Sequence, residues 1–202
     1  MVMDIVQTAL SACEGIEFTD RPSCPSCGGE VQGYDTRKKQ FAIILENEEE
    51  RMIHVRVRRF YCKYCKTYCY ADEPFYPDSR FGSPVIDLCR TFAATIPFCR
   101  TATHLCQLGI VIDRSSVRNY ANRDFGKIQT VDIFNMQLPF SIISLSSLAA
   151  RAGEGSGIEG SEVLAACGFP SAHRKAPQFS VEEKREQQYE KEEREKRQAD
   201  RP

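Results

Sequence analysis

Two stretches decide the fold of this chain: Cys24-Pro25-Ser26-Cys27-Gly28-Gly29 and Cys62-Lys63-Tyr64-Cys65. Each contains a C-x2-C pair, and 34 residues, Gly28 to Tyr61, separate the pairs. Two thiolates on one tight turn can occupy one edge of a tetrahedron, so two such turns supply the four ligands of a structural zinc ion. The spacing predicts one structural Zn²⁺ bound by Cys24, Cys27, Cys62 and Cys65, stabilising a segment whose own core is too small to hold alone.

The paired motif favours this structural site over the other uses of cysteine. A redox C-x2-C motif normally opens a helix, which Gly28-Gly29 does not start well. A catalytic zinc keeps an open position and usually recruits a His or carboxylate ligand, whereas four thiolates close the site. Cys69 competes with Cys65 as a ligand, but its spacing fits the turn less well. The other cysteines are interpreted as small buried apolar residues or bystanders: Cys13, Cys89, Cys99, Cys106 and Cys167.

The residues between the two pairs predict a β-hairpin. Phe41 to Leu45 is a short apolar run, and apolar residues alternate with basic ones from Ile53 to Arg58. Such alternation gives a strand one apolar face and one polar face. The predicted basic face consists of His54, Arg56, Arg58 and Arg59. We therefore expect a zinc ribbon over residues 21–75, preceded by an N-terminal amphipathic helix within residues 1–20.

Residues 76–129 predict three short helices. Ser83 is a candidate N-cap with Pro84 at the first helical position, Gly109 ends the second helix in a left-handed conformation, and Asp113 caps the third. The second and third helices resemble a helix-turn-helix, whose second helix presents its outward residues to the DNA major groove. Arg, Asn and Ser side chains suit base edges and phosphates. The candidate DNA contacts are Arg114, Ser115, Arg118, Asn119, Asn122 and Arg123, with Arg56 and Arg58 of the ribbon.

An ordinary three-helix packing module, with its polar face turned to water, is the competing interpretation. The turn between the second and third helices is longer than the usual three or four residues of a helix-turn-helix. The whole chain carries 27 basic and 28 acidic residues, a net charge of −1, which gives no overall attraction to nucleic acid. Locally the balance differs, because residues 34–70 carry nine basic and five acidic residues, a net charge of +4.

The remainder of the chain predicts little regular structure. Residues 130–179 contain a Ser-, Ala- and Gly-rich stretch and are expected to form a flexible linker with a transient helix near Ile142 to Ala150. Residues 180–202 are almost wholly charged and predict a single solvated helix or a disordered tail. No apolar run approaches the roughly 18 residues of a transmembrane helix, and the start lacks the basic segment of a secretory signal. These features predict a cytoplasmic protein with no membrane partner.

The order of the motifs resembles the N-terminal half of insertion-sequence transposases of the DDE class, over about residues 22–125. The resemblance rests on the first cysteine stretch, on Arg58-Arg59-Phe60-Tyr61-Cys62-Lys63-Tyr64-Cys65, and on Gly109 to Arg118. It implies a zinc ribbon and a helix-turn-helix that bind the terminal repeats of the element. Lys66 departs from the Gly often found at this position, at a cost of about 1 kcal/mol if the residue is left-handed.

The catalytic half of such transposases has no counterpart here. Two-metal phosphoryl transfer needs three carboxylates on a mixed α/β core, and residues 130–202 offer only Asp132 in a strand-like setting. The sequence thus predicts an α+β, zinc-binding, sequence-specific DNA-binding protein that is not itself an enzyme. Double-stranded DNA is the expected partner, and the helical module can also hold a second copy or another protein. A protein-interaction adaptor that docks through the ribbon is the alternative.

Overall fold

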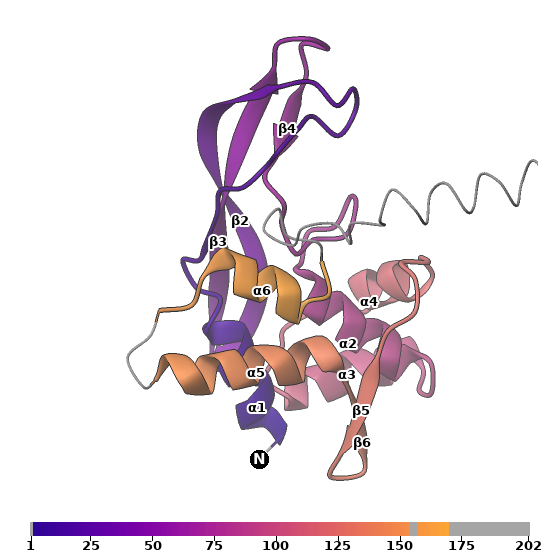
Figure 1. Ribbon diagram of the computed structural model, residues 1–202. Helices are drawn as coiled ribbons and strands as arrows, with labels where there is room; N and C mark the ends of the chain where they lie inside the picture. The colour runs from indigo at the N-terminus through magenta and orange to yellow at the C-terminus, as the bar shows by residue number, and fades with distance from the viewer. Residues whose placement is uncertain (1, 154–156, 170–202) are drawn as a thin grey trace, which may run out of the picture. The chain divides into compact units, whose positions relative to one another are not determined.

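The computed structural model describes residues 2–153 and 157–169 of the 202-residue chain. The chain divides into two units, Met1–Ala172 and His173–Pro202, and every described residue belongs to the first. The predicted charged tail, residues 180–202, and part of the predicted linker lie outside the described residues. Within the first unit, helices and small sheets form an α+β fold, which confirms the predicted class (Figure 1).

A long antiparallel hairpin is the largest element of the sheet. Its strands are β2 (Val31–Glu46) and β3 (Glu49–Cys62). Asn47 and Glu48 connect them, both with positive φ, 52° and 67°. A two-residue turn of this kind matches the right-handed twist of the paired strands. The predicted hairpin is confirmed, and it is longer than its apolar residues indicate, because β3 continues as far as Cys62.

Two short strands flank β3. β1 (Glu17–Phe18) pairs with it in parallel, and β4 (Tyr68–Tyr70) pairs with it antiparallel. β4 lies opposite Arg59–Tyr61, immediately before the second cysteine pair. The turn that carries Cys62 and Cys65 therefore connects two hydrogen-bonded strands, which fixes its position at the end of the sheet.

Three short helices follow in the predicted order: α2 (Ser83–Ala93), α3 (Phe98–Gln107) and α4 (Arg114–Ala121). They pack against one another in all three pairs. Asp113 caps α4 as predicted, accepting the backbone N–H of Ser116 at 2.9 Å. The predicted N-cap of α2 is wrong by one position, because Gly82 occupies it and Ser83 is already the first helical residue.

The turn between α3 and α4 is bonded to the sheet. Gly109 has a φ of 78°, as predicted, and its carbonyl accepts the N–H of Leu45 at 2.8 Å. The N–H of Val111 donates to the carbonyl of Ile43 at 2.9 Å, and Ile110 forms a β-bridge with Ile44. These bonds explain why the turn is long, since part of it runs alongside β2 and is joined to it by a β-bridge. These backbone hydrogen bonds attach the helices to the hairpin.

The predicted flexible linker over residues 130–179 is wrong for the residues that the structure describes. A second hairpin, β5 (Thr130–Ile133) and β6 (Met136–Pro139), leads into α5 (Phe140–Ala152), and α6 (Gly160–Ala166) follows. α5 packs against the N-terminal helix α1 (Val2–Ser11) and against α6. The apolar residues of this segment are buried: Leu138, Ile142, Leu145, Val163 and Leu164.

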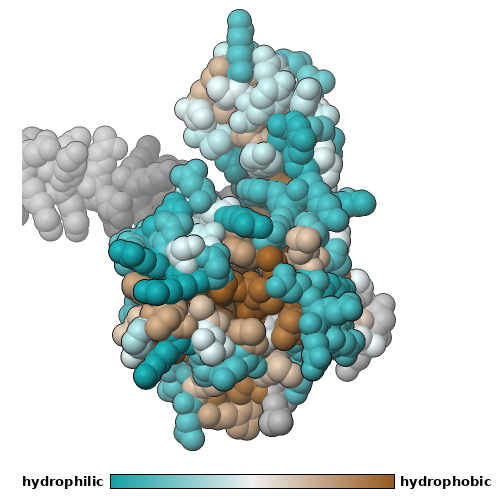
Figure 2. All heavy atoms as spheres, turned by 180° about the vertical axis from the view of Figure 1, so that it is seen from behind, coloured by the Kyte–Doolittle hydropathy of each residue, from teal (hydrophilic) through white to brown (hydrophobic). Residues whose placement is uncertain are grey.

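One apolar core is shared by the helices and the long hairpin, and it extends along β3 as far as Phe60 but does not include the four paired cysteines. It contains residues from α1, α2, α3, α4, α5 and both long strands, among them Leu10, Leu88, Leu105, Val117, Leu145, Ile44 and Ile53. On the face shown in Figure 2, brown hydrophobic residues gather below, while the upper end of the hairpin is pale and teal. The cysteine-bearing end of the sheet therefore lies beyond the main core.

Candidate functional site

The two cysteine turns have the same backbone hydrogen bonds. In the first, Cys24 donates its N–H to the carbonyl of Gly29 and accepts the N–H of Gly28, each at 2.9 Å. In the second, Cys62 donates to Thr67 at 3.0 Å and accepts from Lys66 at 2.9 Å. Gly28 and Lys66 both adopt a left-handed conformation, with φ of 71° and 57°. Two equivalent turns thus present two sulfur atoms each.

The four sulfur atoms converge at the end of the sheet. The Sγ atoms of Cys24 and Cys65 lie 3.5 Å apart, as do those of Cys27 and Cys62, and all four lie within 4.8 Å of one another. A tetrahedral zinc with Zn–S bonds of about 2.3 Å places its sulfur atoms about 3.8 Å apart. Since the observed spacing is close to this, the four predicted ligands fit one structural metal ion.

Hydrogen bonds and mutual repulsion distribute the charge within this cluster. The pKa of Cys24 is lowered to about 6, chiefly by a hydrogen bond from the backbone of Ser26. The backbone of Gly29 acts to lower the pKa of Cys27, but its sulfur neighbours, Cys62 first, outweigh this and raise that pKa to about 12. Four thiols so close together cannot all ionise without a cation, so the cluster fits a divalent metal that would supply the missing positive charge.

The remaining cysteines lie outside the cluster. Cys69, the competing ligand, is buried in β4, and burial raises its pKa. Cys13, Cys89 and Cys167 are buried, as expected for small apolar residues. Cys99 and Cys106 are exposed on α3, so of the two interpretations they are bystanders and not buried apolar residues.

Helix α4 presents only part of the predicted DNA-binding set. Arg114, Arg118, Asn119 and Asn122 are exposed, while Val117 and Tyr120 face the core. Ser115 donates its hydroxyl hydrogen to the capping carboxylate of Asp113. Bonds from Ser115 and Ser116 hold the pKa of that carboxyl well below its usual range, so a negative charge sits at the N-terminus of the helix.

Arg123 is hydrogen-bonded to the loop that precedes α2 and does not point away from the molecule. Its guanidinium donates to the carbonyl of Pro77 at 2.8 Å and to that of Asp78 at 3.1 Å. It also lies 4.8 Å from the ring centroid of Phe125. Arg123 is therefore not available to a ligand in the way that the sequence predicts.

The basic residues of the ribbon are divided between the two faces of the sheet. Arg56 is exposed and pairs with Glu17 at 2.9 Å, and Arg58 lies 5.6 Å from the ring centroid of Phe60. Arg59 does not share their face, because successive residues of a strand point to opposite sides. The Nε and Nη2 atoms of Arg59 donate hydrogen bonds to the two carboxylate oxygens of Asp35, at 2.6 and 2.7 Å. The single basic face predicted from the sequence therefore contains Arg56 and Arg58 but not Arg59.

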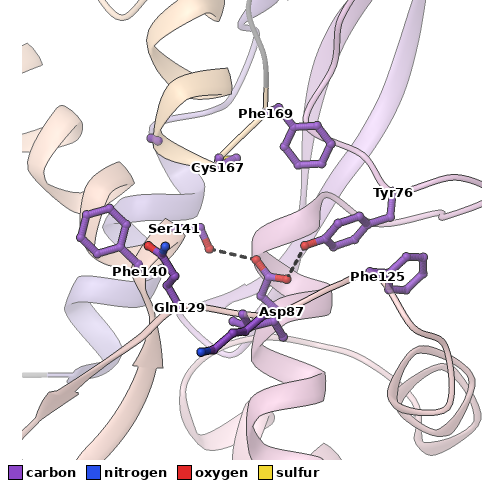
Figure 3. Close-up of a pocket in the computed structure, with 12 residues that line it drawn as sticks. Tyr76, Asp87, Phe125, Gln129, Phe140, Ser141, Cys167 and Phe169 are labelled. Atoms are coloured by element: carbon purple, nitrogen blue, oxygen red, sulfur yellow. Dashed lines mark hydrogen bonds between the residues drawn. The ribbon is translucent and has the colours of Figure 1, made fainter. Parts of the chain in front are cut away.

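A pocket of about 440 Å³ lies where α2 meets the N-terminus of α5 and the end of α6 (Figure 3). Asp87, a largely buried residue, accepts the hydroxyl of Tyr76 at 2.8 Å and that of Ser141 at 3.2 Å. Burial raises the pKa of the Asp87 carboxyl, and both hydroxyls oppose that rise. Sequence analysis missed this group; its only signal is an acidic residue among the apolar residues of α2. The hydrogen bonds join α2 to α5, so we interpret Asp87 as structural.

Comparisons of the chain with known proteins gave no match. No family model, no curated protein and no solved structure matches it. The resemblance to transposases therefore rests on the motifs alone. None of the helices in the described part of the chain is long and apolar enough to cross a membrane.

Proposed function

We propose that the four-cysteine cluster binds one structural zinc ion and that the metal-stabilised protein binds duplex DNA in a sequence-specific manner through α4. The observation that carries the DNA assignment is the exposed surface of α4, where Arg114, Arg118 and Asn119 stand together on the side away from the core. Arginine pairs with guanine edges or phosphates, and asparagine pairs with adenine. In this proposal the protein is cytoplasmic and catalyses no reaction itself.

The packing of α4 supports this role. α2 and α3 hold the helix from behind, and the bonded turn at Gly109 to Val111 fixes its start against β2. A helix that enters a groove must be held rigidly if its side chains are to select bases. The charge of Asp113 disfavours a phosphate at the first turn of the helix, so the contacts are expected from Arg118, Asn119 and Asn122 more than from the N-terminus.

The chemistry of the donor set supports zinc. Four thiolates in a closed tetrahedral arrangement select Zn²⁺ or iron, whereas oxygen-preferring cations are excluded. Elemental analysis of protein purified without added metal separates these two ions, and iron bound to thiolates also colours the protein. One equivalent of zinc is the expected result, and metal-free protein whose cysteine turns are nevertheless ordered would overturn the assignment.

The DNA assignment is tested with full-length, metal-loaded protein and a selection from random duplexes. The replacement of both Arg114 and Arg118 by Ala should weaken binding to the selected duplex roughly tenfold or more. Arg51→Ala, which removes a positive charge at the β2–β3 turn, is the matched control and should have little effect. With about four phosphate contacts, the affinity should fall with salt at a log–log slope near −3.6. Unchanged affinity in the double variant would contradict the role of α4.

The adaptor remains the second candidate, because the net charge of −1 supplies no general attraction to DNA. In that case a zinc-loaded preparation would bind no duplex at low salt, and the ribbon would serve as a docking face for another protein.

A further inference from the structure

Four tyrosines gather on one face of the ribbon end of the sheet. Arg59 and Tyr61 are two positions apart on β3, and their partners on β4 are Tyr70 and Tyr68. Side chains two apart on a strand share a face, so the three tyrosines and Arg59 lie together. Tyr34, at an irregularity in β2, joins them, with its ring centroid 4.8 Å from that of Tyr68. We call this set, Tyr34, Tyr61, Tyr68 and Tyr70, the tyrosine face.

Arg59 holds the rings of this face in place. Its guanidinium lies 5.5 Å from the centroid of Tyr34 and 5.4 Å from that of Tyr68. The same group forms two hydrogen bonds to the carboxylate of Asp35. Tyr61 contacts Tyr68 at a centroid distance of 5.2 Å. The rings are therefore preorganised, which lowers the entropy lost when a ligand binds.

Packing within the ribbon does not use all of this aromatic surface. Tyr34 is 59% exposed, Tyr68 is 53% exposed and Tyr70 is 39% exposed. Rings that served only to stabilise the sheet would be expected to bury more of their area, because burial of apolar surface is what stabilises it. An accessible aromatic surface remains for a partner, with Tyr34 and Tyr61 tilted by 56° and 55° to the ring of Tyr68.

The charge near the tyrosine face is positive. Residues 31–40 and 54–70 together contain eight Lys and Arg residues and one acidic residue, Asp35. Three of the eight, Lys38, Arg56 and Arg58, lie on the opposite face, and Lys39 pairs with Glu73 at 2.7 Å. The carboxylate of Asp35 is already shared by Arg59 and Arg37. Lys63 and Lys66, in the second cysteine turn, have no acidic partner among the residues that the structure describes. The ribbon end therefore attracts a ligand with repeated negative charges.

We propose that the tyrosine face binds single-stranded nucleic acid, with unpaired bases stacked on the tyrosine rings and phosphates near the surrounding lysines. Single strands offer flat bases and regularly spaced phosphates together, and proteins that bind them combine aromatic platforms with positive charge. A duplex hides the faces of its bases, so it does not fit this surface in the same way. The site is separate from α4 and goes beyond the proposed duplex binding.

The first test uses full-length, metal-loaded protein and labelled 15-nucleotide strands of dT, of rU, and of abasic deoxyribose phosphate. The abasic strand keeps the phosphates but has no bases, so tighter binding of dT or rU measures stacking. Comparison of dT with rU shows whether the natural strand is DNA or RNA. Equal binding of all three strands would overturn the proposal, because charge alone would then explain the affinity.

Substitutions then locate the stacking surface. Combined Tyr34→Leu and Tyr68→Leu should weaken binding of the preferred strand roughly tenfold or more, while combined Tyr34→Phe and Tyr68→Phe should retain most of it. Phe134→Leu, at the exposed β5–β6 turn, is the control for loss of an aromatic ring elsewhere. Affinity for the selected duplex should not change in the Leu variant. The proposals for single-strand binding and for duplex binding can thus be contradicted independently of each other.

Two further measurements keep the test decisive if the Leu variant loses its metal. Photocrosslinking of an iodouracil-containing strand to the unmodified protein should label Tyr34 or Tyr68, and labels confined to other segments would overturn the proposal. A polyglutamate peptide of similar charge should bind weakly. If it competes as well as the oligonucleotide, the tyrosine face is a protein-docking surface and single-stranded nucleic acid is not its partner.

Discussion

Lys66 is the residue at which the second cysteine turn departs from the first. It has a φ of 57° and occupies the position that Gly28 fills in the other turn. A left-handed conformation costs a residue with a Cβ about 1–2 kcal/mol, whereas glycine adopts it without strain. Glycine also raises the entropy of the unfolded chain, which offsets about 0.4–1 kcal/mol of that gain. We predict that Lys66→Gly raises the free energy of unfolding by about 1 kcal/mol or less.

The measurement is urea unfolding of the metal-saturated protein. Lys63→Gly is the matched control, because Lys63 is an exposed lysine of the same turn whose φ is not positive. Glycine there should destabilise the turn, since it gains nothing from the left-handed region. Equal effects of the two substitutions would show that charge, and not backbone strain, determines the stability of this turn.

Single residues also show how far sequence reasoning reaches. The four ligands were predictable, because the C-x2-C pattern fixes which sulfur atoms share a turn. The outward side of α4 was predictable from helical periodicity, but the engagement of Arg123 by Pro77 and Asp78 was not. That engagement depends on a loop about 45 residues away in sequence, and periodicity carries no information about such contacts.

At the scale of elements, Asp113 is the cap that defines the start of α4. Its carboxylate accepts the N–H of Ser116 at 2.9 Å and the hydroxyl of the same residue at 2.6 Å. Loss of such a cap typically costs about 1 kcal/mol. We predict that Asp113→Ala destabilises the protein by about this amount at pH 7, as measured by urea unfolding, whereas Asp113→Asn retains most of the stability.

The pH dependence follows from the lowered pKa of Asp113. A carboxyl whose pKa is lower in the folded state stabilises the protein above its unfolded pKa, about 3.9, and this contribution is lost as the pH falls toward the folded pKa. The difference in stability between the native protein and Asp113→Asn should therefore be constant from pH 5 to 7 and shift in favour of Asn below about pH 4. A constant difference throughout would show that the negative charge does not contribute.

Elements differ in how well the sequence predicted them. The β2–β3 hairpin was predicted from alternation and the three helices from caps and spacing, because these signals are local. The α5 helix was predicted only as a transient helix near Ile142 to Ala150, since its Ser- and Ala-rich composition is also that of a linker. Its apolar residues Ile142 and Leu145 are three apart and share one face, but only the packing of α5 on α1 shows that this face is buried.

For the whole molecule, the structure changes the role that the metal is expected to have. The sequence predicts a metal that replaces a core too small to hold alone. In the structure, α1, α2 and α5 contribute Leu10, Leu88 and Leu145 to one shared core. The four cysteines of the candidate metal site do not belong to that core. Metal binding and folding are therefore expected to be coupled locally and not across the entire unit.

Removal of the metal tests this division of stability. Few apolar residues of the first cysteine turn and the adjoining part of β2, Cys24 to Thr36, are buried. Besides the pairing of β2 with β3, the metal and the tyrosine contacts are therefore their main constraints. We predict that a chelator accelerates amide hydrogen exchange in Cys24–Thr36 and Tyr61–Thr67 but leaves exchange in Ser83–Ala93 and Phe140–Ala152 almost unchanged, because those helices are held by the core. Cys24→Ser combined with Cys62→Ser should give the same pattern without chelator. Rapid exchange throughout the described residues after chelation would mean instead that the core cannot persist without the metal, and unchanged exchange at the cysteine turns would mean that the metal does not order them.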